Sequence, residues 1–268
     1  MWAQTRHHLR MYARLQLLHL RVALEYPTNF WIASVAMVLG EGTTIGFMWV
    51  LFRQVPMIAG WQFWEVLLLY ALITLQTALG GFLCSGFWNI PQYVRSGQFD
   101  KMLVRPLSPL LQMATLHLDF RNIGRLVISL FILSQAIYTL PLMWGAWQIA
   151  FFAATLVGST LLLNAIFFVP RCLVFWTLSD TTRIADWLWN FIDFAKYPLN
   201  AYTRPIQFVL TWMIPLAFIT YYPVAVLLGK SLAQPWIGYF TPCAGPIAAV
   251  FAMIVWRRGL ARYQSTGH

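Results

Sequence analysis

Long apolar stretches alternate with short polar ones along most of the chain. Each apolar stretch is about as long as a helix needs to cross a hydrocarbon core of about 30 Å. Prolines, glycines and charged residues gather in the connections between the stretches. The pattern therefore predicts membrane-spanning helices at residues 30–52, 62–87, 122–142, 147–169 and 236–256.

A further segment, at about 172–196, has polar residues at three- and four-residue spacing, so that they share one face of a helix. This pattern suits a fifth span whose polar face turns into the bundle, where Asp180 can pair with Arg183. It equally suits a helix that lies on the cytoplasmic surface. The face consists of Asp180, Arg183, Asp186, Asn190 and Asp193.

The two interpretations divide residues 171–235 differently. In the first, the fifth span is followed by a re-entrant piece at about 206–228. In the second, 206–228 is itself the fifth span, although it contains Pro215 and Pro223. Charge slightly favours the second, because it leaves all the cations of 171–204 on the cytoplasmic side. Both interpretations predict six spans with both termini in the cytoplasm.

The two ends of the chain are basic. Residues 1–28 carry Arg6, Arg10, Arg14 and Arg21 along one stripe beside an apolar stripe, the pattern of a helix that lies on membrane lipid. Residues 257–268 follow the last span, and their arginines place the C-terminus inside.

Composition supports a single membrane-embedded domain over residues 1–268. The chain is 60% hydrophobic and only 10% charged, whereas soluble domains carry about 25% charged residues. We therefore expect an all-α, multi-pass protein of the plasma (inner) membrane. The 18 Lys and Arg against 8 Asp and Glu stand between apolar stretches, which argues against nucleic-acid binding.

The sequence offers little catalytic chemistry. The three cysteines are far apart, and no histidine has a partner at metal-ligand spacing, so we expect neither a metal nor a cofactor on this chain. Gly229-Lys230-Ser231 resembles the end of a phosphate loop, but the glycine that the loop requires five residues earlier is Val224. The chain is therefore not expected to hydrolyse ATP.

The longest polar interruption lies at 91–121, between the second and third apolar stretches. Its excess of cations predicts a cytoplasmic position. Pro106 and Pro109 divide it into a short helix and a following extended or turning piece.

Part of this interruption resembles a segment of the ABC-2 family of export permeases, in particular the single-chain branch related to antibiotic and viologen exporters. That segment has the form R-x-G-x-[LF]-D-x-x-L-[LV]-R-P-L-S. Looser similarity continues at Phe175-Trp176 and Tyr222-Pro223. The matching residues are Arg95, Gly97, Phe99, Asp100, Leu103, Val104, Arg105, Pro106, Leu107 and Ser108.

The resemblance implies a coupling helix that docks in a groove of a separately encoded ABC ATPase. Two permeases, identical or related, would pair above two ATPase subunits, which bind ATP and Mg. Phe99 and Leu103 would be apolar anchors in the groove, while Asp100, Lys101 and Arg105 would set orientation. The resemblance also implies a re-entrant segment before the last span, and we adopt the first interpretation of 171–235 for that reason.

The expected function is efflux of an amphipathic, hydrophobic or lipid-like compound. Glu41 lies near the middle of the first span, where an acid is costly unless it faces protein or water. It could form an interhelical hydrogen bond or belong to the translocation path with Asp180, Arg183 and Asp186. Two alternatives remain: a secondary transporter that moves protons on Glu41, and a membrane-embedded enzyme or scaffold that uses these acids together with Asp193.

Overall fold

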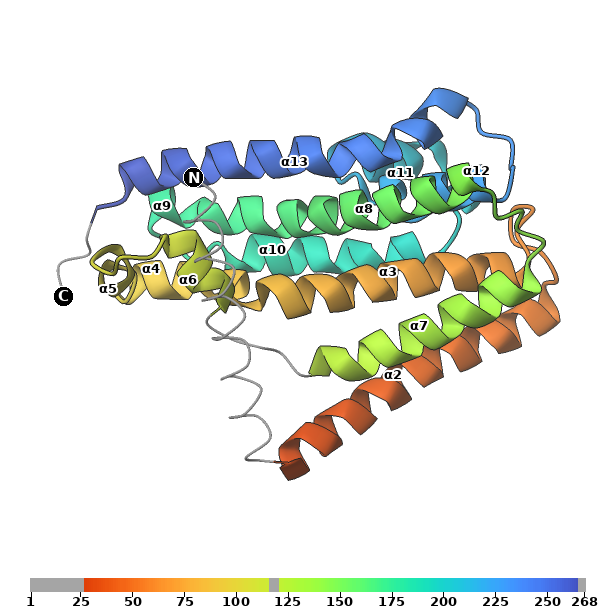
Figure 1. Ribbon diagram of the computed structural model, residues 1–268, viewed down its shortest axis with the longest axis horizontal. Coiled ribbons are helices and arrows are strands. Elements are labelled where there is room, and N and C mark those ends of the chain that lie inside the picture. The colour runs from red at the N-terminus through yellow and green to blue at the C-terminus, as the bar shows by residue number, and fades with distance from the viewer. Residues whose placement is uncertain (1–26, 116–120, 265–268) are drawn as a thin grey trace.

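A computed structural model describes residues 27–115 and 121–264, and the predicted helix at 1–28 lies almost wholly outside them. Within this part of the chain the structure is helical and contains no β-strand. Five helices are long and apolar enough to cross a membrane (Figure 1). They are α2 (Pro27–Gln54), α3 (Phe63–Cys84), α7 (Arg121–Thr139), α8 (Ala146–Cys172) and α13 (Pro235–Arg262).

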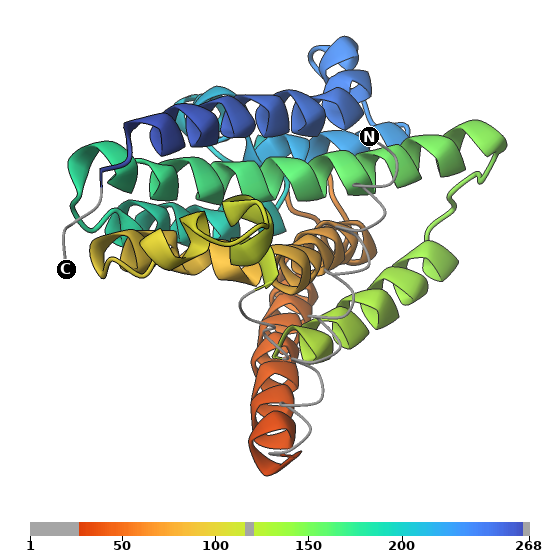
Figure 2. The ribbon, with the colours of Figure 1, turned by 60° about the vertical axis from the view of Figure 1, so that its left-hand side comes forward.

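The helix α3 is the centre of the bundle. It packs along α7 on one side and also lies beside α8, while α2 packs mainly against α7 and makes less contact with α3 (Figures 1 and 2). Of the most apolar stretch of α3, 72% is buried, against 11% for α2. Because α2 keeps an apolar surface without protein cover, its exposed side chains are suited to lipid or to another membrane protein.

The helices α8 and α13 pack along most of their lengths and touch at two glycines. A Cβ atom on Gly245 would overlap the carbonyl oxygen of Gly158, and one on Gly158 would lie 2.6 Å from the carbonyl oxygen of Pro242. Small residues allow membrane helices to approach this closely.

We expect Gly245→Ala to destabilise the protein by roughly 1–3 kcal/mol, because the added methyl group forces α8 and α13 apart. The thermal unfolding midpoint of the purified protein measures this effect. Gly42→Ala on α2 is the matched control, since its Cβ would meet no atom within 4 Å. Equal thermal unfolding midpoints for the two variants would show that α8 and α13 do not approach each other closely at Gly245.

The fourth span is longer than expected. The helix α8 continues through Pro170 to Cys172, and the apolar stretch reaches Thr177 through α9 (Val174–Thr177). Leu178 then adopts a left-handed conformation with φ 51°, which ends the helix. The single helix expected at 172–196 is therefore wrong.

The next helical stretch consists of α10 (Thr182–Trp189) and η2 (Asn190–Lys196), and it lies between α8 and α3. The second part is a 3₁₀ helix, which rises about 2.0 Å per residue instead of 1.5 Å. The eight residues of α10 and the seven of η2 therefore reach about 26 Å, close to the thickness of a hydrocarbon core.

Residues 204–227 form a bent pair of helical segments. Arg204–Met213 and Leu216–Leu227 meet at an angle of 76°, a geometry of either a broken span or a re-entrant loop. The break falls at Pro215, which has no N–H for helical hydrogen bonding. A short 3₁₀ turn, η3 (Leu199–Ala201), precedes the pair. The pair itself consists of α11 (Arg204–Phe208), η4 (Val209–Met213, a π-helical turn), η5 (Leu216–Phe218) and α12 (Tyr221–Leu227).

The polar interruption lies where α3 ends and close to the C-terminal end of α13 (Figure 1). We call this side of the molecule the α5 end and the opposite side the α12 end. Pro109 does not continue an extended piece as expected but begins a helix, because proline is well suited to a first helical position. The elements are η1 (Ser85–Asn89), α4 (Ile90–Arg95), α5 (Asp100–Leu103) and α6 (Pro109–Thr115).

Candidate functional site

The turn between α4 and α5 depends on Gly97. This residue has φ 69°, a left-handed conformation that favours glycine. The amide of Ser96 donates to the carbonyl of Gln92 at 3.0 Å, and the amide of Phe99 donates to the carbonyl of Tyr93 at 3.0 Å. The chain thus reverses at Gly97, and the side chain of Phe99 is directed back into the protein.

Phe99 is fully buried in its own chain, with 0% of its surface exposed. Its ring packs edge-to-face against Phe175, Trp256 and Tyr263, with ring centroids 5.5, 6.1 and 5.1 Å away. The expectation that Phe99 is an anchor in the groove of a partner is therefore wrong for this structure. The ring instead joins the segment to α9 and to the end of α13.

Two polar contacts strengthen this attachment. The hydroxyl of Tyr263 donates to Oδ1 of Asp100 at 2.9 Å, and Arg95 forms an ion pair with Asp180 at 3.3 Å. Asp180 also accepts hydrogen bonds from Thr182 at the start of α10, which together with Arg95 hold the pKa of this carboxyl below its ordinary value. The expected salt bridge between Asp180 and Arg183 is replaced by this contact with Arg95.

Tyr263→Phe is expected to cost about 1 kcal/mol, the usual net value of one hydrogen bond. Burial and the bond to Asp100 raise the pKa of Tyr263 to about 12, so the bond is intact below pH 10 and is lost as the pH rises through about 12. Amide hydrogen exchange of residues 96–104 at neutral pH should become faster. Unchanged exchange would show that Tyr263 does not hold the segment.

A protruding turn follows Phe99, and we call residues 101–106 the knob. Val104 is 85% exposed and Leu103 42%, the side chains of Lys101, Arg105 and Pro106 are exposed, and only Met102 points inward. The side-chain amide of Gln112 on α6 donates to the carbonyl oxygens of Met102 and Leu107, both at 2.8 Å. The knob is therefore an exposed, partly apolar turn with a fixed shape.

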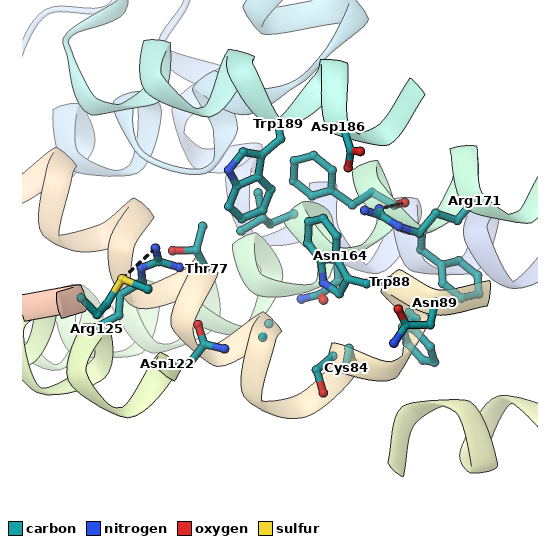
Figure 3. Close-up of a pocket in the computed structure, with 18 residues that line it drawn as sticks. Thr77, Cys84, Trp88, Asn89, Asn122, Arg125, Asn164, Arg171, Asp186 and Trp189 are labelled. Atoms are coloured by element: carbon teal, nitrogen blue, oxygen red, sulfur yellow. Dashed lines mark hydrogen bonds between the residues drawn. The ribbon is translucent and has the colours of Figure 1, made fainter. Parts of the chain in front are cut away.

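A cavity of about 740 Å³ lies beside the attachment of this segment, between α3, α8, the start of α7 and α10 (Figure 3). Gly80 and Gly81 form part of its wall, where a Cβ atom would collide with the amides of Asn164 and Asn122. In the part of the chain that the structure describes, no cluster of His, Cys, Asp and Glu could hold a metal ion. The polar lining includes Thr77, Asn89, Asn122, Asn164, Arg125, Arg171 and Asp186.

Arg125 stands on one side of the cavity and is neutralised by Glu41. Its Nε donates to Oε1 of Glu41 at 2.8 Å, and their side chains are only 20% and 13% exposed. The hydroxyl of Tyr70 donates to the other carboxylate oxygen of Glu41. One carboxylate therefore joins α2, α3 and α7.

Arg171 stands on the opposite side, near the end of α8 (Figure 3). It is 1% exposed, and its guanidinium lies 3.8 Å from the ring centre of Trp88. Its Nη1 donates to the carbonyl of Phe167 at 2.6 Å, while Nε and Nη2 are buried without a hydrogen-bond partner. Asp186 attracts it electrostatically, but the two form no salt bridge in the described structure.

The structure separates the four residues predicted for a translocation path. Asp186 lines the cavity, and Glu41 reaches its edge through Arg125. Asp180 and Arg183 do not line it. Asp193 pairs with Lys196 at 2.7 Å, so the acids proposed for a membrane-embedded enzyme do not converge.

Sequence reasoning missed Arg125 and Arg171 as cavity residues. In the sequence both stand beside the ends of apolar stretches, where arginine is common and does not by itself indicate a cavity. Asn164 gave a signal that could have directed attention to this site, since it is a polar residue inside the apolar fourth span, six residues before Pro170.

Comparison with known proteins identifies one family. The family model described as ABC-2 family transporter protein matches residues 38–267. No curated protein and no solved structure matches the chain. The matched region contains the knob, both arginines of the cavity and all five long helices, except for the first residues of α2.

Proposed function

Because the chain belongs to the ABC-2 family of transporter proteins, we propose that it is the permease subunit of an exporter that a separate ATPase drives. Permeases of this family work with ABC ATPase subunits in general. Two such subunits, carrying ATP and Mg, would act on a pair of permeases, identical or related. The proposed cargo is an amphipathic or hydrophobic compound.

The observation that carries this proposal is the combination of an exposed knob with a buried attachment. Val104 is available for contact, whereas Phe99, five residues earlier, is enclosed by the protein's own aromatic rings. A loop that does not bind a partner protein would need neither the fixed turn nor an exposed apolar tip. Interfaces gain most of their binding energy from a few apolar or aromatic side chains of this kind.

The attachment offers a path for movement from the knob to the cavity. Phe99 contacts α9 and the end of α13, and Arg95 pairs with Asp180, two residues before the start of α10. The helix α10 supplies Asp186 and Trp189 to the cavity lining. A push on the knob when the ATPases close would therefore shift α10 and α13 relative to α3 and change the shape of the cavity.

Orientation follows from the same proposal. ATP is cytoplasmic, so the knob and the α5 end would face the cytoplasm, and the last residues of α13 would lie on that side. The clustered Arg257, Arg258 and Arg262 agree with this orientation. The membrane would then be the plasma (inner) membrane, with both termini inside.

Affinity purification of the full-length chain from its native membranes tests the proposal. We expect an ATP-hydrolysing protein with a phosphate loop to accompany it in about equal amount. Addition of purified partner to the reconstituted permease should then support ATP-dependent transport. Repeated purification without any such protein would contradict the proposal.

A further inference from the structure

We infer that Arg171 binds the acid group of an anionic amphiphile in the cavity. The ligand class is a carboxylate or phosphate monoester attached to an apolar body. Its role as the transported substrate rests on the proposed function, whereas its binding does not.

The free edge of the Arg171 guanidinium carries the inference. A guanidinium presents Nε and Nη2 as a parallel pair of donors, which matches the two oxygens of a carboxylate or phosphate. These are the two buried nitrogens without a partner, and Nη1 on the other edge is already bonded to the carbonyl of Phe167. A buried charged donor that lacks an acceptor is costly, so an acceptor from a ligand would stabilise it.

The surroundings complete an amphiphile site. Arg171 extends toward the middle of the cavity, and Asn164 from α8 lines the wall nearby (Figure 3). The ring of Trp88 covers one face of the guanidinium, which leaves its edge for the ligand. Apolar side chains that could contact a hydrocarbon body come from Phe87, Leu163, Phe167, Phe168 and Trp189.

A purely structural role accounts for only part of this arrangement. Arginine near the C-terminal end of a helix interacts well with the last carbonyls, and Nη1 of Arg171 does so. That role would not require the other two nitrogens to be buried at a cavity without acceptors. It would also not require Asp186, an acid on the facing helix, to remain too far away for a salt bridge.

Asp186 is the group that opposes the ligand. Its carboxylate lines the same cavity and is attracted by the same guanidinium. A bound anion would experience its repulsion, so removal of this charge should strengthen binding. This provides a variant that tests the site through a gain of affinity.

Binding of radiolabelled dodecyl phosphate tests the inference. The full-length chain, with any subunits that accompany it, is placed in nanodiscs of zwitterionic lipid without nucleotide. We expect Arg171→Lys, which keeps the charge but lacks the paired donors, to weaken binding at least tenfold. We expect Asp186→Asn to strengthen it severalfold. Arg53→Lys is the matched control, because Arg53 lies 4.0 Å above the ring centre of Trp49 but does not line the cavity.

Competition defines the ligand class. Dodecanoate should displace the label, whereas dodecyltrimethylammonium and inorganic phosphate at equal concentration should not. Displacement by phosphatidic acid in the nanodisc would support a membrane lipid as the source, and lack of it would support an amphiphile that enters from water. Equal affinity in wild type and Arg171→Lys, or displacement by the cation, would overturn the inference.

The binding experiment and the purification test of the proposed function can fail independently of each other. Binding is measured without ATP, so an exporter that handles neutral or cationic cargo would pass the purification test and fail this one. If Arg171→Lys does not fold, Asp186→Asn decides: unchanged or weaker binding in that variant overturns the inference.

Discussion

Val104→Glu is expected to weaken the association between this chain and the proposed ATPase partner by tenfold or more while the chain remains folded. The side chain of Val104 is 85% exposed at the tip of the knob, so the substitution disturbs no internal packing. A carboxylate at an apolar contact loses hydration without gaining a partner, and tenfold corresponds to about 1.4 kcal/mol. The ratio of ATPase to permease after affinity purification measures the loss.

Met143→Glu is the matched control. Met143 is also 85% exposed but lies in the connection between α7 and α8, at the α12 end. Its substitution should leave the ratio unchanged. A loss of ATPase in both variants would indicate a general effect of added charge, and a loss in neither would remove the knob from the interface.

Phe99→Ala should behave differently from Val104→Glu. It removes a fully buried ring from a cluster of aromatic side chains, so we expect a lower unfolding midpoint as well as weaker association. Only the exposed residue can lose its partner without a loss of stability, and this contrast separates attachment from contact.

Removal of the charge on Glu41 is expected to destabilise the protein by roughly 3–5 kcal/mol, because Glu41→Gln leaves the guanidinium of Arg125 without its carboxylate at a largely buried site. Arg125→Gln should cost a similar amount for the converse reason. The double variant Glu41→Gln/Arg125→Gln should recover much of the loss, since no unpaired charge remains. Thermal unfolding of the purified variants provides the three values.

The same variants decide the role of Glu41. If the double variant is stable and still transports, the ion pair serves to hold α2, α3 and α7 together, as the contacts with Arg125 and Tyr70 indicate. If it is stable but inactive, Glu41 takes part in transport, and the proton-coupled alternative regains weight. Additive losses in the double variant would show that the two residues do not form a pair.

The main features of the fold were predictable because lipid imposes a simple rule. A helix that crosses a bilayer needs about 20 apolar residues. The five long helices can therefore be recognised directly as apolar stretches of the sequence. Residues 172–196 did not follow this rule. The left-handed Leu178 and the 3₁₀ turn of η2 depend on local packing and cannot be recognised from apolar length.

The candidate site was only partly predictable, because the sequence does not show whether a given side chain points into the protein or toward its surface. The motif includes all the residues of the knob, and Gly97 explains the turn that precedes it. Phe99 and Leu103 were predicted to act alike, although one is buried and the other exposed. The difference depends on Trp256 and Tyr263, more than 150 residues away in the sequence, and only the fold brings these rings together.

The cavity escaped prediction for a related reason. Arg125 and Arg171 come from the start of α7 and the end of α8, where each resembles an ordinary boundary arginine. Both arginines line the same cavity only because the folded chain brings them together with residues of α3 and α10. The positions of the predicted acids also depend on contacts in the folded chain. Asp180 forms an ion pair with Arg95, whereas Asp186 lines the cavity.

Photocrosslinking from the tip of the knob shows directly whether an ATPase docks there in native membranes. A benzophenone amino acid is introduced at position 104 of the full-length chain and, as a control, at position 143, and both are irradiated in native membranes. An adduct with a phosphate-loop ATPase is expected from position 104 and none from position 143. Adducts at position 104 with lipid alone or with a second copy of this chain alone would contradict the proposed docking of the knob on an ATPase.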